Sequence, residues 1–327
     1  MLVVQVISMV LLKVEKLKKW FPMKKGIFGK TFYVRAVENV SFELEKGEAV
    51  SLVGESGSGK TTLGKTILRL YEPTDGRIFF DGKDITSLSN KELMWYRRQT
   101  GIVQQDPYGS LAPHFTIYKI LEEPLIIHGV SKEERREKIF SILNEIRLPP
   151  EEFAFKYPHM LSGGQLQRVA IARAMILDPK LIVADEPVSM LDASVRVEIL
   201  NLFAELQRKH DMSVIYITHD LSTTRYFSEK IFIMYAGHIV ERAPTKEMLN
   251  NPLHPYTRAL FNAIPDPDPE NRLRMREVPP GEPPSLVNPP PGCRFKPRCP
   301  IATSKCDEEP PEYEVSPGHF VKCWYPK

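Results

Sequence analysis

The sequence of 327 residues predicts an α/β protein with a mainly parallel sheet, a helical insertion and a small C-terminal extension rich in cysteine and proline. Three observations predict this class. Strand patterns alternate with helix patterns, a glycine-rich loop joins a strand to a helix, and the composition changes near residue 244. Such alternation favours ligand sites at the carboxyl ends of the strands.

The first elements are two strands around a turn, followed by a loop and a helix. Apolar and polar residues alternate before the turn Glu45-Lys46-Gly47, and a continuous apolar run follows the turn. A second turn, Pro73-Thr74-Asp75-Gly76, precedes another apolar run. The predicted elements are strands at 11–16, 37–44, 49–53 and 77–80 and a helix at 61–70.

Helical patterns broken by prolines then replace the alternation over about 106–160, which indicates an insertion within the α/β domain. The alternation resumes with helices at 166–177 and 195–209 and strands at 181–184 and 213–218. The chain is loop-like and proline-rich after residue 244. We therefore expect one domain at 10–250 and a C-terminal extension at 251–327.

The composition is ordinary for a globular protein, with 42% hydrophobic and 26% charged residues. The net charge of +3 points neither toward nor away from a nucleic-acid partner. No apolar run reaches the roughly 20 residues that span a bilayer. The apolar start, residues 1–12, lacks a basic lead-in and a cleavage site, so we interpret it as a tail and expect a cytoplasmic protein.

The glycine-rich loop fits the phosphate-binding pattern G-x-x-x-x-G-K-[ST]. Its glycines let the backbone amides face phosphates, Lys60 supplies a charge to the β and γ phosphates, and the Thr61 hydroxyl is placed to ligate Mg²⁺. The strand before it and the helix after it are the context that this loop requires. The nucleotide-binding residues are Gly54, Glu55, Ser56, Gly57, Ser58, Gly59, Lys60, Thr61 and Thr62.

Further polar residues follow predicted strands. Asp185 and Glu186 end the apolar run at 181–184, so we assign Asp185 to Mg²⁺ and Glu186 to polarising the attacking water. His219 ends another strand and is expected to contact the γ-phosphate or the water. Gln105 follows a short strand and is a further candidate Mg²⁺ ligand.

A second anion site is predicted at the start of the helix at 166–177. It consists of Leu161, Ser162, Gly163, Gly164 and Gln165, and a serine hydroxyl with glycine amides at a helix start suits a phosphate. The chain thus carries two phosphate-binding devices, and their spacing alone does not decide whether they serve one nucleotide or two.

In this order, and together with Ser189-Met190-Leu191-Asp192, these segments resemble an ABC-type ATPase domain over roughly residues 10–250. The resemblance implies that two such domains pair head to tail around two ATP molecules. Residues 161–165 would then bind the γ-phosphate of the partner's ATP. It also implies that Glu186 is the general base and His219 the switch histidine. An ordinary P-loop kinase or GTPase has no counterpart of residues 161–165.

The same resemblance implies an aromatic side chain that stacks on adenine. Phe32 and Tyr33 are both candidates, and either could pack in the core instead. The sequence does not choose between them; we take Tyr33 as the site residue.

The extension contains all four cysteines, Cys293, Cys299, Cys306 and Cys323, at the spacing C-x5-C-x6-C-x16-C. Disulfides are rare in the cytoplasm, and paired C-x2-C zinc spacing is absent. The favoured interpretation is a structural [4Fe–4S] cluster, with nearby arginine and lysine residues to offset its charge. Zn²⁺ and reduced or disulfide-bonded cysteines are the alternatives.

The cysteine pattern and the phrase at 251–257 resemble the ATP-binding subunits of oligopeptide and dipeptide permeases. The resemblance implies an ATPase that powers import of peptides or similar solutes such as oligosaccharides from the cytoplasmic face of the membrane. Its partners would be an identical or paralogous ATPase subunit, two permease subunits and, indirectly, an extracellular solute-binding protein. The phrase at 20–29 resembles one of two ATPase types. A soluble ABC-type ATPase acting on nucleic acid or ribosomes is the alternative.

Overall fold

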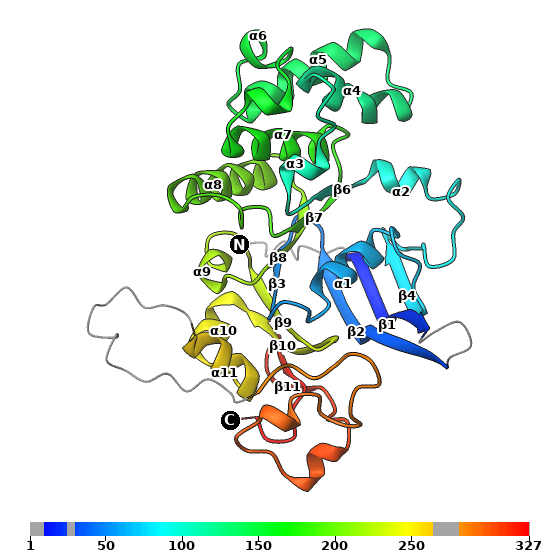
Figure 1. Cartoon of the computed structure of the whole chain (residues 1–327), viewed down its shortest axis with the longest axis vertical. Coiled ribbons are helices and arrows are strands. Elements are labelled where there is room, and N and C mark those ends of the chain that lie inside the picture. The colour runs from blue at the N-terminus through cyan, green and yellow to red at the C-terminus, as the bar shows by residue number, and fades with distance from the viewer. Residues whose placement is uncertain (1–9, 25–29, 264–280, 327) are drawn as a thin grey trace, which may run out of the picture. The chain divides into compact units, whose positions relative to one another are not determined.

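A computed structural model describes residues 10–24, 30–263 and 281–326. Residues 1–9 of the predicted tail at 1–12 and residues 25–29 of the phrase at 20–29 lie outside them. The strands are β1 (Val10–Lys24), β2 (Thr31–Glu45), β3 (Ala49–Val53), β4 (Asp75–Phe80), β5 (Lys83–Asp84), β6 (Thr100–Val103), β7 (Leu181–Asp185), β8 (Ser213–Thr218), β9 (Lys230–Tyr235), β10 (His238–Pro244), β11 (Tyr313–Ser316) and β12 (His319–Val321) (Figure 1).

Helices alternate with these strands, and several are a single turn long. They are α1 (Lys60–Ile67), α2 (Met94–Arg98), α3 (Pro107–Ser110), α4 (Ile117–Ile127), α5 (Lys132–Glu145), α6 (Pro150–Phe153), α7 (Gly163–Met175), α8 (Ala193–Lys209), α9 (Leu221–Thr224), α10 (Thr245–Asn250) and α11 (Pro255–Asn262).

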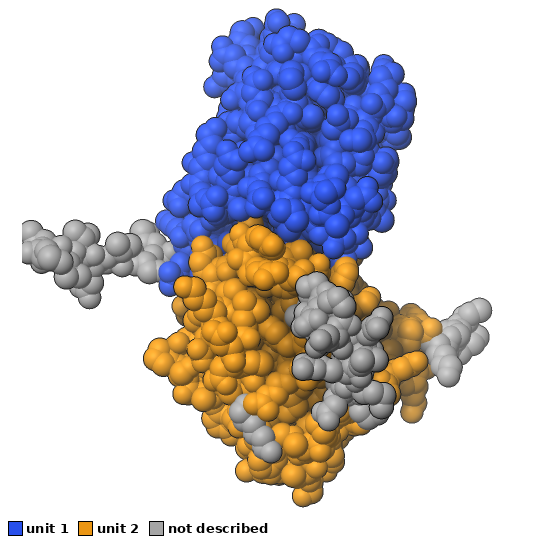
Figure 2. All heavy atoms as spheres, turned by 90° about the vertical axis from the view of Figure 1, so that its left-hand side faces the viewer, with its two compact units in different colours: residues 1–12, 44–49, 80–216 blue, residues 13–43, 50–79, 217–327 orange. Residues whose placement is uncertain are grey.

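The chain forms two compact units, coloured separately in Figure 2. Unit 1 comprises residues 1–12, 44–49 and 80–216, and unit 2 comprises residues 13–43, 50–79 and 217–327.

Unit 1 contains the parallel pair β6–β7, in which Thr100 lies opposite Leu181. All five residues of β7 are buried, as expected for a parallel strand that is covered on both faces. Gly101 allows α7 to approach β6, because a Cβ atom there would lie 2.3 Å from Ala174 O. The helices α4, α5 and α6, which fall within the range of the predicted helical insertion, lie together at the top of Figure 1.

Unit 2 contains strands in the order β11-β12-β10-β9-β3. The strands β3 and β9 are parallel, whereas β10 pairs antiparallel with both β9 and β12. Ala236 and Gly237 form the tight β9–β10 turn with positive φ angles of 45° and 91°. A separate sheet in this unit has the order β2-β1-β4.

The extension differs from the loop-like structure predicted after residue 244. The extension contains α11, β11 and β12, and α10 precedes it; β12 continues the sheet through β10, with Val321 opposite Glu241. This pairing joins residues about 80 positions apart, so a local sequence pattern does not reveal it. The domain boundaries at 250 and 251 remain predictions.

Among the described residues, no helix combines the length and apolar character needed to cross a bilayer.

Candidate nucleotide site

The phosphate loop lies in unit 2 between β3 and α1, as predicted. Gly59 has a φ of 105° and precedes the first residue of α1. A Cβ atom on Gly54 would lie 2.1 Å from Met234 O, and one on Gly59 would lie 2.1 Å from Ala36 O. These two glycines are therefore required by close backbone packing as well as by the turn.

Lys60 is buried and points back over its own loop. Its Nζ atom donates hydrogen bonds to Gly54 O at 2.7 Å and to Glu55 O at 2.9 Å. The loop carbonyls thus hold the ammonium group beside the helix start, where phosphate is expected. Thr61 and Thr62, the next residues, are exposed and half-buried.

The β9–β10 turn supports this loop, and sequence reasoning did not find it. Gly237 N–H donates to Ser58 O at 2.8 Å, and Ser58 N–H donates to Glu55 O at 3.2 Å. The glycine at position 237, between two apolar runs, is the signal that could have marked this turn, because its φ of 91° favours glycine.

Unit 1 carries the predicted acidic residues. Asp185 is buried at the end of β7, and Glu186 follows it with a φ of 46°, which is unusual for a residue other than glycine. The structure brings Gln105 to Glu186: Gln105 Nε2 donates to Glu186 Oε2 at 3.1 Å. Ser189 also holds the backbone of Glu186 in place, because its hydroxyl donates to Glu186 O at 3.0 Å. Two predicted catalytic residues from distant parts of the sequence are thus in contact.

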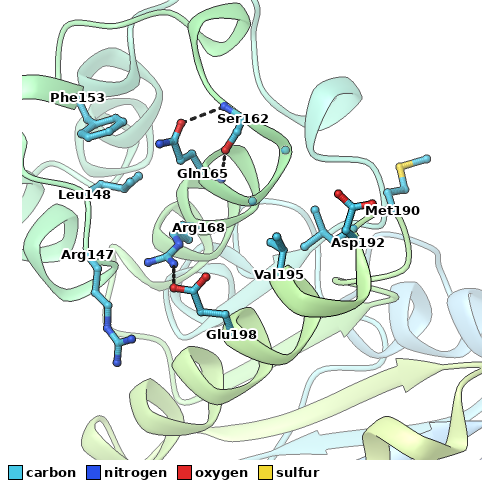
Figure 3. Close-up of a pocket in the computed structure, with 13 residues that line it drawn as sticks. Arg147, Leu148, Phe153, Ser162, Gln165, Arg168, Met190, Asp192, Val195 and Glu198 are labelled. Atoms are coloured by element: carbon cyan, nitrogen blue, oxygen red, sulfur yellow. Dashed lines mark hydrogen bonds and ion pairs between the residues drawn. The ribbon is translucent and has the colours of Figure 1, made fainter.

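Four residues of the predicted second anion site, Ser162 to Gln165, line a cavity of about 530 Å³ in unit 1 (Figure 3), whereas Leu161 is buried in the core. Ser162 begins α7 with a capping box, in which its hydroxyl accepts from Gln165 N–H and Gln165 Oε1 accepts from Ser162 N–H. A Cβ atom on Gly164 would lie 2.7 Å from Val195 Cγ1. Arg168 of α7 and Glu198 of α8 also line the cavity and form an ion pair with a 2.5 Å separation. The cavity therefore combines a helix start with a polar wall.

The two remaining predicted residues lie in unit 2. His219 is exposed and follows β8. Tyr33 is 45% exposed, whereas Phe32 is half-buried, and the Tyr33 ring centroid lies 6.1 Å from that of Trp20. Exposure thus distinguishes the two aromatic candidates where the sequence did not.

Comparison with known proteins identifies the chain. A family model described as ABC transporter matches residues 37–189, and one described as the C-terminal region of oligopeptide/dipeptide transporters matches residues 240–306. The chain is 45% identical over 318 residues to the oligopeptide transport ATP-binding protein AppF of Bacillus subtilis, and this match covers 96% of each protein. It belongs to the ABC transporter ATP-binding family.

A second relative of this ATPase is the dipeptide transport ATP-binding protein DppF of Escherichia coli K12, at 44% identity over 315 residues, or 96% of this chain and 94% of that one. Among solved structures, the dimeric ATP-binding cassette MJ0796 in a post-hydrolysis state with ADP and Pi matches with a TM-score of 0.63 at 34% identity. That match covers 72% of this chain and 98% of the other. The predicted fold class and family resemblance are confirmed.

The cysteines of this ABC transporter ATP-binding protein line one small cavity in unit 2, together with His254 and Phe295. Cys293 N–H donates to Cys306 O at 2.9 Å. Burial raises the pKa of the Cys293 thiol to about 11, and it also raises the pKa values of Cys299 and Cys323. Within the ranges that the structure describes, no group of three or more histidine, cysteine or acidic residues is arranged to hold a metal ion. The predicted cluster is therefore not supported by the geometry of the thiols as they stand.

Proposed function

We propose that this chain is the ATP-hydrolysing subunit of a membrane importer for oligopeptides, dipeptides or similar solutes such as oligosaccharides. The observation that carries the proposal is the contact between Gln105 and Glu186, which joins two predicted catalytic residues in an ATPase of this family. Relatives named for oligopeptide and dipeptide transport, matched over nearly the whole chain, support the solute class.

In this proposal the phosphate loop binds the β and γ phosphates through its amides and Lys60. Thr61, Asp185 and Gln105 would hold Mg²⁺, which offsets the phosphate charge when it is bound; hydroxyl, carboxylate and amide oxygens suit this ion. Glu186 accepts a proton from the attacking water, and Gln105 holds its carboxylate in place. His219 contacts the γ-phosphate, and Tyr33 stacks on adenine.

The cavity at Ser162 closes over the ATP of a second ATPase subunit, identical or paralogous. A helix start with a serine hydroxyl and glycine amides suits a γ-phosphate supplied from outside the chain. A single subunit would therefore hydrolyse ATP poorly, and efficient turnover would need the pair.

The helical insertion would pass the ATP-driven motion to two permease subunits at the cytoplasmic face of the membrane. The end of α4 supports this, since Ile126 and Ile127 are 52% and 62% exposed. Ile127 also lines a cavity of about 370 Å³ in unit 1. Exposed apolar side chains beside a groove are typical of a protein interface. An extracellular solute-binding protein would act on the permease rather than on this chain.

Glu186→Gln tests the proposal. The substitution should leave ATP binding intact and lower the hydrolysis rate about 100-fold or more, because it removes the general base. Glu205→Gln is the matched control, since Glu205 is an exposed residue of the same unit and forms a surface ion pair with Arg147. Unchanged turnover in Glu186→Gln would remove this assignment. Recovery of permease chains with the protein would support import, and recovery of RNA would favour the nucleic-acid alternative.

We also propose that the four cysteines hold a structural metal centre, a [4Fe–4S] cluster in preference to Zn²⁺. All four cysteines line one cavity, so together they offer the four thiolate ligands that such a cluster requires. The buried guanidinium groups of Arg294 and Arg298 would offset the charge of the centre. Anaerobically purified protein should contain iron and sulfide and absorb broadly in the visible range. Zinc without iron would select the alternative, and the absence of both metals would refute the proposal.

A further inference from the structure

Glu55, the second residue of the phosphate loop, is held by residues from the C-terminal end of the chain. Its backbone N–H donates to the Tyr256 hydroxyl at 2.9 Å. Its carboxylate accepts two hydrogen bonds from Arg298 Nη1, at 3.2 Å to Oε1 and 3.0 Å to Oε2. Residues about 200 and 240 positions away therefore fix both the backbone and the side chain of this loop residue.

The same residue orients the charged group of the loop. Glu55 O accepts from Lys60 Nζ at 2.9 Å and from Ser58 N–H at 3.2 Å. If the Glu55 peptide rotates, Lys60 loses one of the carbonyls that direct its ammonium group. Contacts to Glu55 thus act on the cation expected at the β and γ phosphates.

Arg298 is well placed to act as a fixed support. Its side chain is 7% exposed and lies beside the ring pair of Tyr235 and Phe295, with its guanidinium carbon 5.9 Å and 6.0 Å from their ring centroids. Those rings pack against Tyr256, with centroid distances of 4.5 Å and 5.5 Å. Glu55 itself is 31% exposed, so the ion pair is partly buried, and its packed aromatic support gives it a more defined geometry than a pair between two mobile surface side chains.

The Tyr256 hydroxyl is suited to accept this hydrogen bond. Burial raises its pKa, so the group stays neutral at ordinary pH. His254 fixes the start of α11, because its Nδ1 accepts from Tyr256 N–H at 3.0 Å. Burial lowers the pKa of His254 to about 3, so its ring is a neutral acceptor.

We propose that Arg298 and Tyr256 are positioning residues for ATP binding, so that the C-terminal extension sets the affinity of the phosphate loop for nucleotide. The inference rests on the proposed ATPase function and deepens it. Arg298 acts through Glu55 on Lys60 and does not itself contact the phosphates.

The test measures the dissociation constant of Mg–ATP in the Glu186→Gln background, where slow hydrolysis allows equilibrium binding. Arg298→Met keeps much of the apolar stem and removes the donors, and Glu55→Gln keeps the shape and removes the charge. Each should weaken ATP binding about tenfold, since hydrogen bonds to charged groups contribute more than neutral ones. Tyr256→Phe should weaken binding about threefold, and Arg298→Lys should recover only part of the loss because lysine lacks the planar fork.

Arg242→Met is the matched control. Arg242 also belongs to unit 2 and forms two hydrogen bonds with a glutamate of the extension, Glu312, at 3.2 Å and 3.0 Å. The ATP affinity of Arg242→Met should stay within about twofold of that of the parent protein, even if the melting temperature of the variant falls.

The double variant Arg298→Met with Glu55→Gln separates positioning from general loss of stability. If Arg298 acts through Glu55, the double variant should bind ATP about as weakly as the worse single variant. Additive losses, or unchanged affinity in both single variants, would overturn the inference. If Arg298→Met fails to fold, Glu55→Gln and Tyr256→Phe decide the question. Failure of the parent protein to bind ATP would instead count against the proposed function.

Discussion

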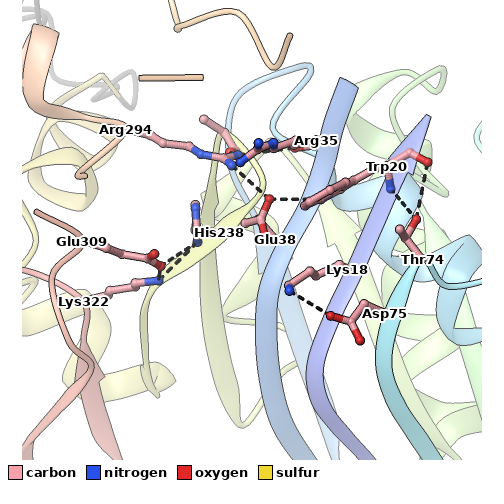
Figure 4. A network of polar contacts seen from close by, with 11 residues as sticks. Lys18, Trp20, Arg35, Glu38, Thr74, Asp75, His238, Arg294, Glu309 and Lys322 are labelled. Atoms are coloured by element: carbon pink, nitrogen blue, oxygen red, sulfur yellow. Dashed lines mark hydrogen bonds and ion pairs between the residues drawn. The ribbon is translucent and has the colours of Figure 1, made fainter. Parts of the chain in front are cut away.

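Arg294→Met should destabilise the protein, because Arg294 of the extension contacts β2 and the β9–β10 turn within unit 2. Its side chain is 5% exposed and lies 3.4 Å from the Glu38 carboxylate, which is 10% exposed (Figure 4). The guanidinium also donates to Ala236 O and Arg35 O. Burial lowers its pKa to about 10, which still leaves it charged at neutral pH.

The magnitude follows from what remains after the substitution. The Glu38 carboxylate keeps one described hydrogen bond, from Trp20 Nε1 at 3.0 Å, and becomes a buried charge without its Arg294 partner. Breaking a buried pair in this way costs about 3–5 kcal/mol. The unfolding entropy of a chain of 327 residues is about 0.7 kcal/mol per kelvin, so the melting temperature should fall by about 4–7 °C.

Differential scanning calorimetry measures this change. The double variant Arg294→Met with Glu38→Gln removes both charges and should recover about half of the loss. Arg242→Met, which breaks a more exposed pair, should lower the melting temperature by only about 1–2 °C. A drop no larger than that in Arg294→Met, or a double variant as unstable as the sum of the single variants, would refute the reasoning.

Two further predictions concern a helix start and a buried histidine. Ser162→Ala should lower the stability by about 1 kcal/mol, because it removes the cap of α7. Ser162→Asp should keep the cap and the melting temperature but abolish ATP hydrolysis, because its charge repels phosphate. Normal turnover in Ser162→Asp would exclude a phosphate site there. Burial, together with the cations Lys322 and Arg294, holds the pKa of His238 well below 6.5 in the folded protein. The unfolded state therefore binds more protons, so stability should fall as the pH drops below about 6.5. His238→Gln should flatten this decline in melting temperature, and an unchanged slope would contradict the prediction.

Local sequence patterns predicted the central elements well. The strands at 49–53 and 213–218 match β3 and β8, because continuous apolar runs bounded by turns are a local signal. The first strand was predicted at 11–16 but β1 continues to Lys24, through charged and aromatic residues that have no clear alternation. Pairing with neighbouring strands extends it, and a local pattern does not contain that information.

The candidate site also has some features that a local sequence pattern predicts and others that only the fold reveals. The phosphate loop and the carboxylates at 185 and 186 were predictable, since their chemistry requires particular residue types at fixed spacing. The contact between Gln105 and Glu186 joins positions 81 residues apart, and only folding reveals it. The supports of Glu55 were missed, because neither a tyrosine nor an arginine in a proline-rich region carries a signal for a loop 200 residues earlier.

The sequence by itself determined the family and predicted the nucleotide chemistry and the residues that carry it, because phosphate binding needs glycines, a lysine and a hydroxyl in one short segment. The tertiary structure decided what surrounds that segment. It placed Arg298 and Tyr256 of the extension on Glu55 and gathered four cysteines around one cavity. These arrangements arise from strand pairing and from burial of the aromatic cluster over long sequence separations, and short motifs do not encode them.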